Sequence, residues 1–186
     1  MALQPLKDKY NELKDFFFVY LIPTYLPSSG MFLLAQSSPR PPNPYVAVNL
    51  MSQIEADGED ENIMDDEGNQ QRKGKRIITV DLYAYSESST RFDGETNCWE
   101  MLQELRFALG YPETRLELNQ INCSIRDEGT VLDSSTYLST TNEPSAHLQV
   151  TLNTTICQDI DSGAIENVNI SGSMSGLVRD FGVSKP

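Results

Sequence analysis

Few side chains in this sequence could carry out hydrolysis. His147 is the only histidine, and no serine-bearing turn of the kind that presents a nucleophile lies near it in the chain. The segment 172–176, Gly-Ser-Met-Ser-Gly, has the glycines of such a turn, but Met174 occupies the position of the nucleophile. The sequence also contains no phosphate-binding glycine loop, no paired histidines and no distinct carboxylate pair. We therefore expect no catalytic residue and no enzyme activity, and we place His147 on the solvent face of a strand.

Acidic residues are concentrated between positions 55 and 67. Eight of these thirteen residues are acidic and none is basic: Glu55, Asp57, Glu59, Asp60, Glu61, Asp65, Asp66 and Glu67. A calcium loop that began at Asp57 would need glycine at its sixth position and glutamate at its twelfth, where the chain has Asn62 and Gly68. We expect a solvated, charged loop without a metal or cofactor, and we keep a calcium-dependent module as an alternative.

Charge and cysteine content narrow the class of protein. The net charge is -13 and the pI about 4.4, which argues against a surface that grips phosphates, because nucleic-acid binding depends on clustered Lys and Arg. DNA that passes nearby should be repelled. The three cysteines, Cys98, Cys123 and Cys157, form no CxxC pair, and their odd number fits a reduced intracellular chain.

The N-terminal segment has the apolar spacing of an amphipathic helix. Leu6, Tyr10, Leu13, Phe17 and Tyr20 follow one another at intervals of four and three residues. We predict a helix over residues 4–21, ended by the prolines that follow. Its apolar run at 16–22 is too short to span a bilayer and does not have the pattern of a secretory signal.

Two strong strands and a second helix follow. The pattern predicts strands over 45–53 and 77–85, joined by a long charged hairpin loop at 54–75. Leucines at helical spacing predict a helix over 93–109, stopped by Gly110 and Pro112. Leu82 and Ala84 share one face of the strand that includes them, and Tyr83 and Tyr85 share the other. We therefore expect helices to cover one of these faces and a neighbouring subunit to cover the other.

Three further strands complete the predicted domain, over residues 119–126, 131–140 and 146–156. Strands that follow one another through short links favour an antiparallel sheet. The predicted fold class is α+β, with two helices packed on one face of that sheet, and the domain covers residues 1–157.

Residues 158–186 are rich in Gly, Ser, Asn and Asp and carry too few apolar residues for a core. We predict an extended C-terminal arm. Ile165, Val168 and Ile170 suit a strand that adds to an exposed sheet edge of a neighbouring subunit, so we consider them a candidate assembly strap.

The order of these elements resembles the neck and tail terminator proteins of long-tailed bacteriophages. The resemblance covers residues 5–156 and is carried by order and spacing. Its most distinctive part is the segment 40–46, Arg-Pro-Pro-Asn-Pro-Tyr-Val, which opens the first strand. The strand at 76–85, the helix at 99–109 and the strand at 146–155 follow in the same order.

The resemblance implies a structural virion protein rather than an enzyme. It implies a closed homo-oligomeric ring, with about six copies, that ends the tail tube and joins it to the head connector. The expected partners are other copies of the chain, the tail tube, the head connector and, as a further candidate, the sheath. Double-stranded DNA would pass through without specific binding, and no membrane is involved. The expected location is the virion neck, after assembly in the host cytoplasm.

Two hypotheses follow for the acidic stretch and for the assembly state. The acidic residues would line the channel of the ring or its mouth and keep the DNA backbone from adhering. An alternative is that the protein acts as a monomeric minor tail or head-completion adaptor, and self-association separates this from the ring.

Overall fold

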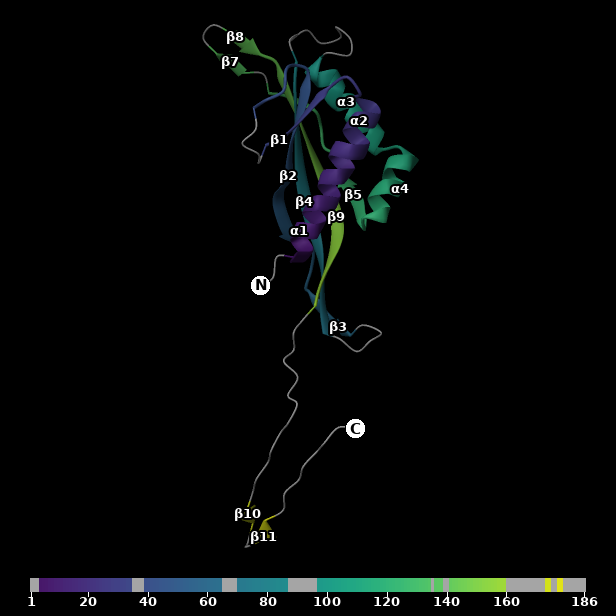
Figure 1. Ribbon diagram of the computed structural model, residues 1–186, viewed down its shortest axis with the longest axis vertical. Helices are drawn as coiled ribbons and strands as arrows, with labels where there is room; N and C mark the ends of the chain where they lie inside the picture. The colour runs from purple at the N-terminus through teal and green to yellow at the C-terminus, as the bar shows by residue number, and fades with distance from the viewer. Residues whose placement is uncertain are drawn as a thin grey trace.

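The computed structural model describes residues 4–34, 39–64, 70–86, 97–134, 136–138, 141–159, 173–174 and 177–178. Within them the chain forms an α+β domain built on a seven-stranded sheet that does not close on itself (Figure 1). Its main path runs β1-β2-β4-β9-β5, while β3 pairs with β4 and β6 pairs with β9. The strands are β1 (Gly30–Leu33), β2 (Tyr45–Ala56), β3 (Glu61–Met64), β4 (Gln70–Tyr85), β5 (Cys123–Asp127), β6 (Leu132–Asp133) and β9 (Ser145–Asp159).

The sheet has one apolar face and one polar face because its strands alternate. Val48, Leu82 and Leu148 lie level with one another on the three central strands, and each is buried in the main core. The other face carries polar and aromatic side chains, Asp81 and Tyr83 among them. The helices therefore cover the face that carries Leu82 and Ala84, whereas cover of the opposite face by a neighbouring subunit stays a prediction.

The N-terminal helix packs on the apolar face and continues past its predicted end. It consists of α1 (Gln4–Asp15), the π-helix η1 (Phe16–Leu21) and α2 (Ile22–Tyr25). Leu13 and Phe17 of the predicted stripe are fully buried. The prediction that Pro23 ends the helix was wrong. Pro23 lies in the first turn of α2, directly after the π-helix η1, and the chain stays helical through it to Tyr25.

The second predicted helix is α3 (Cys98–Leu109), and the structure adds α4 (Pro112–Gln120). Asn97 caps α3 by accepting a hydrogen bond from the Trp99 amide. The α4 helix was missed because Pro112 was interpreted as a stop, whereas it stands at the beginning of the new helix. The helices α1, α2, α3 and α4 lie on one side of the sheet (Figure 1).

Two predictions about the sheet need correction. The sheet is mixed rather than wholly antiparallel, because β1 runs parallel to β2. The strand predicted over 131–140 is divided, since β6 joins the main sheet, whereas β7 (Thr136–Leu138) pairs with β8 (Thr141–Glu143). The sequence predicted a loop here because β1 is only four residues long and begins at the glycine of the Ser-Ser-Gly segment at 28–30.

The predicted charged loop at 54–75 contains strands. Its beginning is the end of β2, its last six residues start β4, and β3 pairs with β4 between them. The prediction failed because exposed charges do not prevent a strand when opposite charges face each other, as Glu61 does Lys73.

Pairing also continues past the predicted end of the domain. Gln158 and Asp159 still belong to β9, where they pair with Arg72 and Gln71. In the arm, β10 (Ser173–Met174) pairs with β11 (Leu177–Val178). No helix in the described ranges is long and apolar enough to cross a membrane.

Candidate functional site

One end of the sheet carries most of the residues that the sequence singled out. We call this part the stem, and define it as residues 54–64 with residues 70–76 of β4 and 154–159 of β9. In Figure 1 its outermost strand, β3, lies beyond the helices. At its β3 end the stem therefore presents strands without the helical cover of the rest of the sheet.

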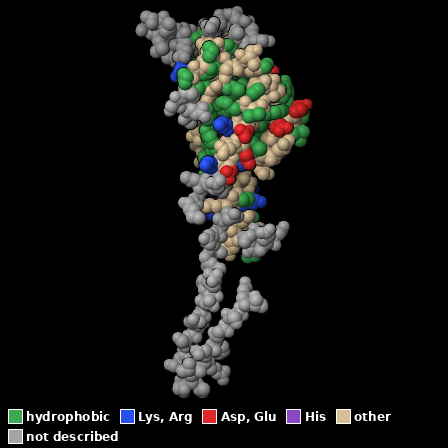
Figure 2. Space-filling view, in the orientation of Figure 1, with side chains coloured by type: hydrophobic (Ala, Val, Ile, Leu, Met, Phe, Trp, Pro, Cys, Tyr) green, Lys and Arg blue, Asp and Glu red, His purple; other side chains and the backbone are tan. Residues whose placement is uncertain are grey.

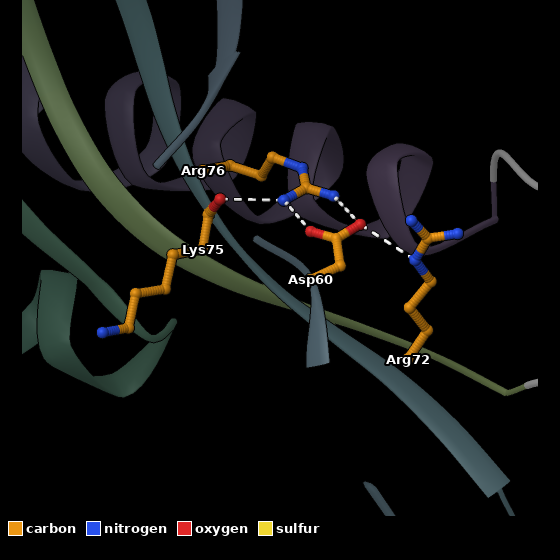
Figure 3. A network of polar contacts seen from close by, with 4 residues as sticks. All are labelled: Asp60, Arg72, Lys75 and Arg76. Atoms are coloured by element: carbon orange, nitrogen blue, oxygen red, sulfur yellow. Dashed lines mark hydrogen bonds and ion pairs between the residues drawn. The ribbon is translucent and has the colours of Figure 1, made fainter. Parts of the chain in front are cut away.

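An ion-pair network holds the acidic segment of the stem against β4 (Figure 3). Asp60 Oδ1 accepts a hydrogen bond of 2.6 Å from one terminal nitrogen of Arg76, and Asp60 Oδ2 accepts one of 2.9 Å from the other. Arg72 Nε donates a third bond of 3.0 Å to Oδ2. A forked guanidinium that meets both oxygens of a carboxylate fixes its orientation as well as its position. Asp60 thus anchors the segment that leads into β3.

Gly74 makes room for this network. It lies between Arg72 and Arg76 on the same face of β4, and a Cβ atom added there would collide with Asp60 Oδ1 and with Arg76. The Arg-x-Gly-x-Arg spacing therefore places two cations and a gap on one side of the strand.

The network also shifts the ionisation of its members. The hydrogen bond from Arg76 lowers the pKa of the Asp60 carboxyl, and its charge and that of Arg72 add to this lowering. The hydrogen bond to Asp60 in turn raises the pKa of Arg76. Both groups are charged across the physiological pH range, so the anchor is permanent under physiological conditions.

The predicted acidic site residues divide into three groups. Glu55, Asp57, Glu59 and Glu61 are exposed, and Asp57 lies 3.6 Å from a terminal nitrogen of Arg126 on β5. Asp60 is the anchor. Asp65, Asp66 and Glu67 lie outside the described residues, as do the strap residues Ile165, Val168 and Ile170.

A second polar cluster lies on the sheet face opposite the helical layer. Asp81 on β4 is 8% exposed, and its Oδ1 lies 3.0 Å from His147 Nε2 and 3.2 Å from Gln149 Nε2, both on β9. The His147 ring stacks on Tyr83 at 4.5 Å between centroids. Burial raises the pKa of Asp81, but the polar side chains around its carboxylate, those of Ser52, His147 and Gln149, outweigh the effect of burial, so the net shift is downward. Asp81 therefore stays ionised, and its buried carboxylate is stabilised by hydrogen bonds from its neighbours.

The backbone beside Asp81 is irregular. Pairing of β2 with β4 shifts register between Asn49 and Gln53, and Met51 has a φ of 52° there. A bulky residue with positive φ is uncommon, and the bulge turns Ser52 toward β4, where its hydroxyl donates to the Thr79 carbonyl at 3.2 Å. The Ser52, Asp81 and His147 groups do not form a hydrolytic triad, because the carboxylate rather than the imidazole stands between the other two.

The two outer edges of the stem, one on β9 and one on β3, are the third feature of the site. On the outer side of β9, pairing with β5 ends at Thr154, and no described strand pairs with residues 155–159 on that side. A notch of about 440 Å³ opens there, lined by Lys73, Asn119, Asn122, Cys123, Ser124, Thr155 and Cys157. On the opposite side of the stem, no described strand pairs with the outer side of β3.

Among the residues that the structure describes, these features form a platform of strands with polar clusters and open edges, and no Ser, Thr or Cys side chain is hydrogen-bonded to His147. In the described part of the chain, no group of three or more His, Cys, Asp or Glu side chains could hold a metal ion. A protein-family model described as phage neck terminator protein matches residues 10–176. The chain belongs to the phage neck terminator family. Comparison with curated proteins found no match.

Membership of this family makes the chain a structural protein of the phage neck and places it in the virion. The match spans the whole sheet and its helices apart from the first turns of α1. The family resemblance predicted from the sequence is thereby confirmed, and so is the α+β fold class.

Sequence reasoning missed both polar clusters. The signal for the anchor was present in the alternation of Arg72, Gly74 and Arg76, which puts three residues on one strand face. The signal for the second cluster was Asp81, an acid in the middle of an apolar strand. Neither signal identifies the partner, because Asp60 comes from the segment before β3 and His147 comes from β9.

Proposed function

We propose that the chain forms a closed ring, with about six copies, that ends the tail tube and joins it to the head connector. Membership of the neck terminator family is the observation that carries this proposal. Two structural features support it. Among the described residues, no strand pairs with the outer side of β3 or of residues 155–159 of β9, and no helix covers the second sheet face (Figure 1). Surfaces of this kind suit a subunit that is completed by its neighbours.

The acidic residues of the stem would contribute to the wall of the channel. Glu55 and Glu61 lie level with Ile77 and Lys73 on β4, on the sheet face opposite the helical layer. If the helices form the outside of the ring, this face lines the channel and the exposed carboxylates repel the DNA backbone. The acidity is not confined to the stem, since acidic side chains also lie over α4 and, mixed with basic ones, over α1 (Figure 2).

The C-terminal arm would act as a strap between subunits. The proposal rests on the sequence of residues 164–171, whose apolar residues suit addition to a neighbour's sheet edge. Because β9 continues to Asp159, a chain that ends there keeps the whole sheet and removes only the arm. We expect this truncated chain to fold, and the necks that it builds to fall apart more readily than those of the full chain.

Particles assembled without this chain test the proposed role. We expect DNA-filled heads and tails that do not join, with joining restored when the purified protein is added. Joined, infectious particles in the absence of the chain would contradict the role. If instead the added protein restores joining as a single copy, the chain is a monomeric adaptor.

A further inference from the structure

The stem is a three-stranded ribbon whose two outer edges differ in character. At the level of residues 70–73 of β4, β3 lies on one side and β9 on the other. The β3 edge belongs to an acidic segment that includes Glu59 and Glu61 and ends in Met64, a methionine that is 66% exposed. The β9 edge lies beside the polar notch, which Lys73 and the side chains of Asn119, Asn122 and Ser124 help to line.

An open strand edge presents rows of unpaired N–H and C=O groups and is a template for pairing with another chain. Here the two edges differ in charge. The β3 strand lies in an acidic segment, whereas the notch beside β9 is lined by Lys73 of the neighbouring strand β4 and by the amide side chains of Asn119 and Asn122. The one acidic residue of this β9 edge, Asp159, lies outside the lining of the notch. Both β3 and β9 run antiparallel to β4, so they point in the same direction.

We propose that the outer edge of β3 in one copy, which pairs with no described strand, pairs in parallel with residues 155–159 of β9 in the next copy. This inference rests on the ring proposed above and identifies the surface that would close it. A contact between two different surfaces of identical subunits closes into a ring when the rotation between neighbours allows it. The acidic end of β3 enters the notch beside Cys157, and the exposed Met64 becomes covered.

The proposal explains why the stem is held so firmly. Asp60 fixes the start of β3 through three hydrogen bonds to Arg72 and Arg76, and so presents the edge in one orientation before assembly. Preorganisation of this kind reduces the entropy that binding would otherwise lose.

The geometry of the pairing also fits a passage for DNA. About six copies with three strands each give roughly 18 strands, and barrels of 16–18 strands enclose an aqueous channel. The ring would then be lined by a continuous sheet with no open edges.

Cysteine cross-linking tests the pairing directly, because Cys157 is exposed on the β9 edge. Glu61 lies opposite Lys73, which lies opposite Cys157, so Glu61 and Ile63 share a sheet face with this cysteine. Asn62 and Met64 point to the other face. Within one chain, positions 61 and 157 are two strands apart, about 9.5 Å from the strand spacing, which is too far for a disulfide.

The four variants E61C, N62C, I63C and M64C form a matched set at exposed or half-exposed positions. We expect mild oxidation to give a ladder of covalent oligomers with E61C or I63C, and no ladder above the wild-type background with N62C or M64C. The ladder should vanish on reduction and when Cys157→Ser is added. Cys98 and Cys123 contribute little background, since both are buried.

The outcomes separate the inference from the proposed function. If the wild-type protein forms rings but neither E61C nor I63C gives a ladder, the ring stands and the β3–β9 pairing is wrong. Equal ladders from all four variants, or a ladder that survives Cys157→Ser, would also overturn the pairing. A wild-type protein that stays monomeric at every concentration and in the virion would overturn both.

Discussion

Asp60 is the residue on which the order of the stem depends most directly. We expect Asp60→Asn to increase hydrogen exchange at the amides of β3, because an amide side chain cannot hold two guanidinium groups by charge. Exchange at the core strands should stay unchanged. Glu59→Gln is the matched control, since Glu59 is an exposed acid one position away. Unchanged protection of β3 in Asp60→Asn would show that the strand is held by its ladder with β4 alone.

The same anchor should respond to acid. The folded-state pKa of Asp60 is lowered, so its contribution to stability is present above the unfolded-state pKa and is lost as the pH falls through the folded-state value. We expect wild-type β3 to approach the exchange behaviour of Asp60→Asn only below about pH 4. Loss of protection near neutral pH would point to a different titrating group.

A substitution at Gly74 tests whether the Asp60 ion-pair network needs the space that this glycine leaves. A methyl group at this position competes for space with Asp60 and Arg76, so Gly74→Ala should loosen β3 as Asp60→Asn does. In the double variant the two effects should not add, because each removes the same interaction. Fully additive effects on β3 exchange would mean that Gly74 acts separately from the ion pair.

Asp81 should matter for global stability rather than for the stem. Replacing it with Asn removes the negative charge at the oxygen that His147 Nε2 and Gln149 Nε2 share, at a cost of roughly 1–3 kcal/mol at neutral pH. The lowered pKa of Asp81 means that this difference from the wild type is largest above about pH 4 and shrinks as the pH falls through the folded-state pKa. Denaturant unfolding of both proteins from pH 2 to pH 7 measures it. A difference that is constant with pH would contradict the role of the charge.

At the scale of elements, α1 and α4 are joined by a buried lysine. Lys9 is 7% exposed, and its ammonium donates to the Ile121 carbonyl, just after the last residue of α4, and to Glu12. Lys9→Met keeps most of the packing but leaves that carbonyl without its charged donor, so we expect a loss of about 1–3 kcal/mol. Lys7→Met, at an exposed position of the same helix, should change the free energy of unfolding by less than about 0.5 kcal/mol. Equal effects of the two substitutions would contradict this account.

The elements that the sequence predicted well are those with strong periodicity. The leucine spacing of α3 and the alternation of β4 reflect burial on one face, which is a local property of the sequence. The elements that it missed depend on contacts with other parts of the chain. The β1 strand exists because β2 lies beside it, β3 because its charges face those of β4, and α4 because Pro112 starts a helix that the packing of Leu118 stabilises.

The candidate site was predictable to a smaller extent. The sequence located the acidic stretch, but it could not show that Asp60 differs from Glu59, because only the approach of Arg72 and Arg76 distinguishes them. The open edges were likewise invisible, since they depend on where β5 ends relative to β9.

At the scale of the whole molecule, the described domain has the surfaces of a subunit whose sheet is completed by neighbouring subunits in an assembly. It has a single core under one helical layer, an opposite sheet face that carries Asp81 and Tyr83, and a stem with two open edges. Family membership places this part in the phage neck, where a subunit works through its surfaces.

The assembly state of the purified chain tests the central claim most directly. Light scattering across a size-exclusion column, with negative-stain images of the same fractions, gives both the mass and the shape of the particle. We expect a closed ring with about six copies, favoured at high protein concentration. A monomer at every concentration that also remains a single copy in the assembled neck would contradict the account.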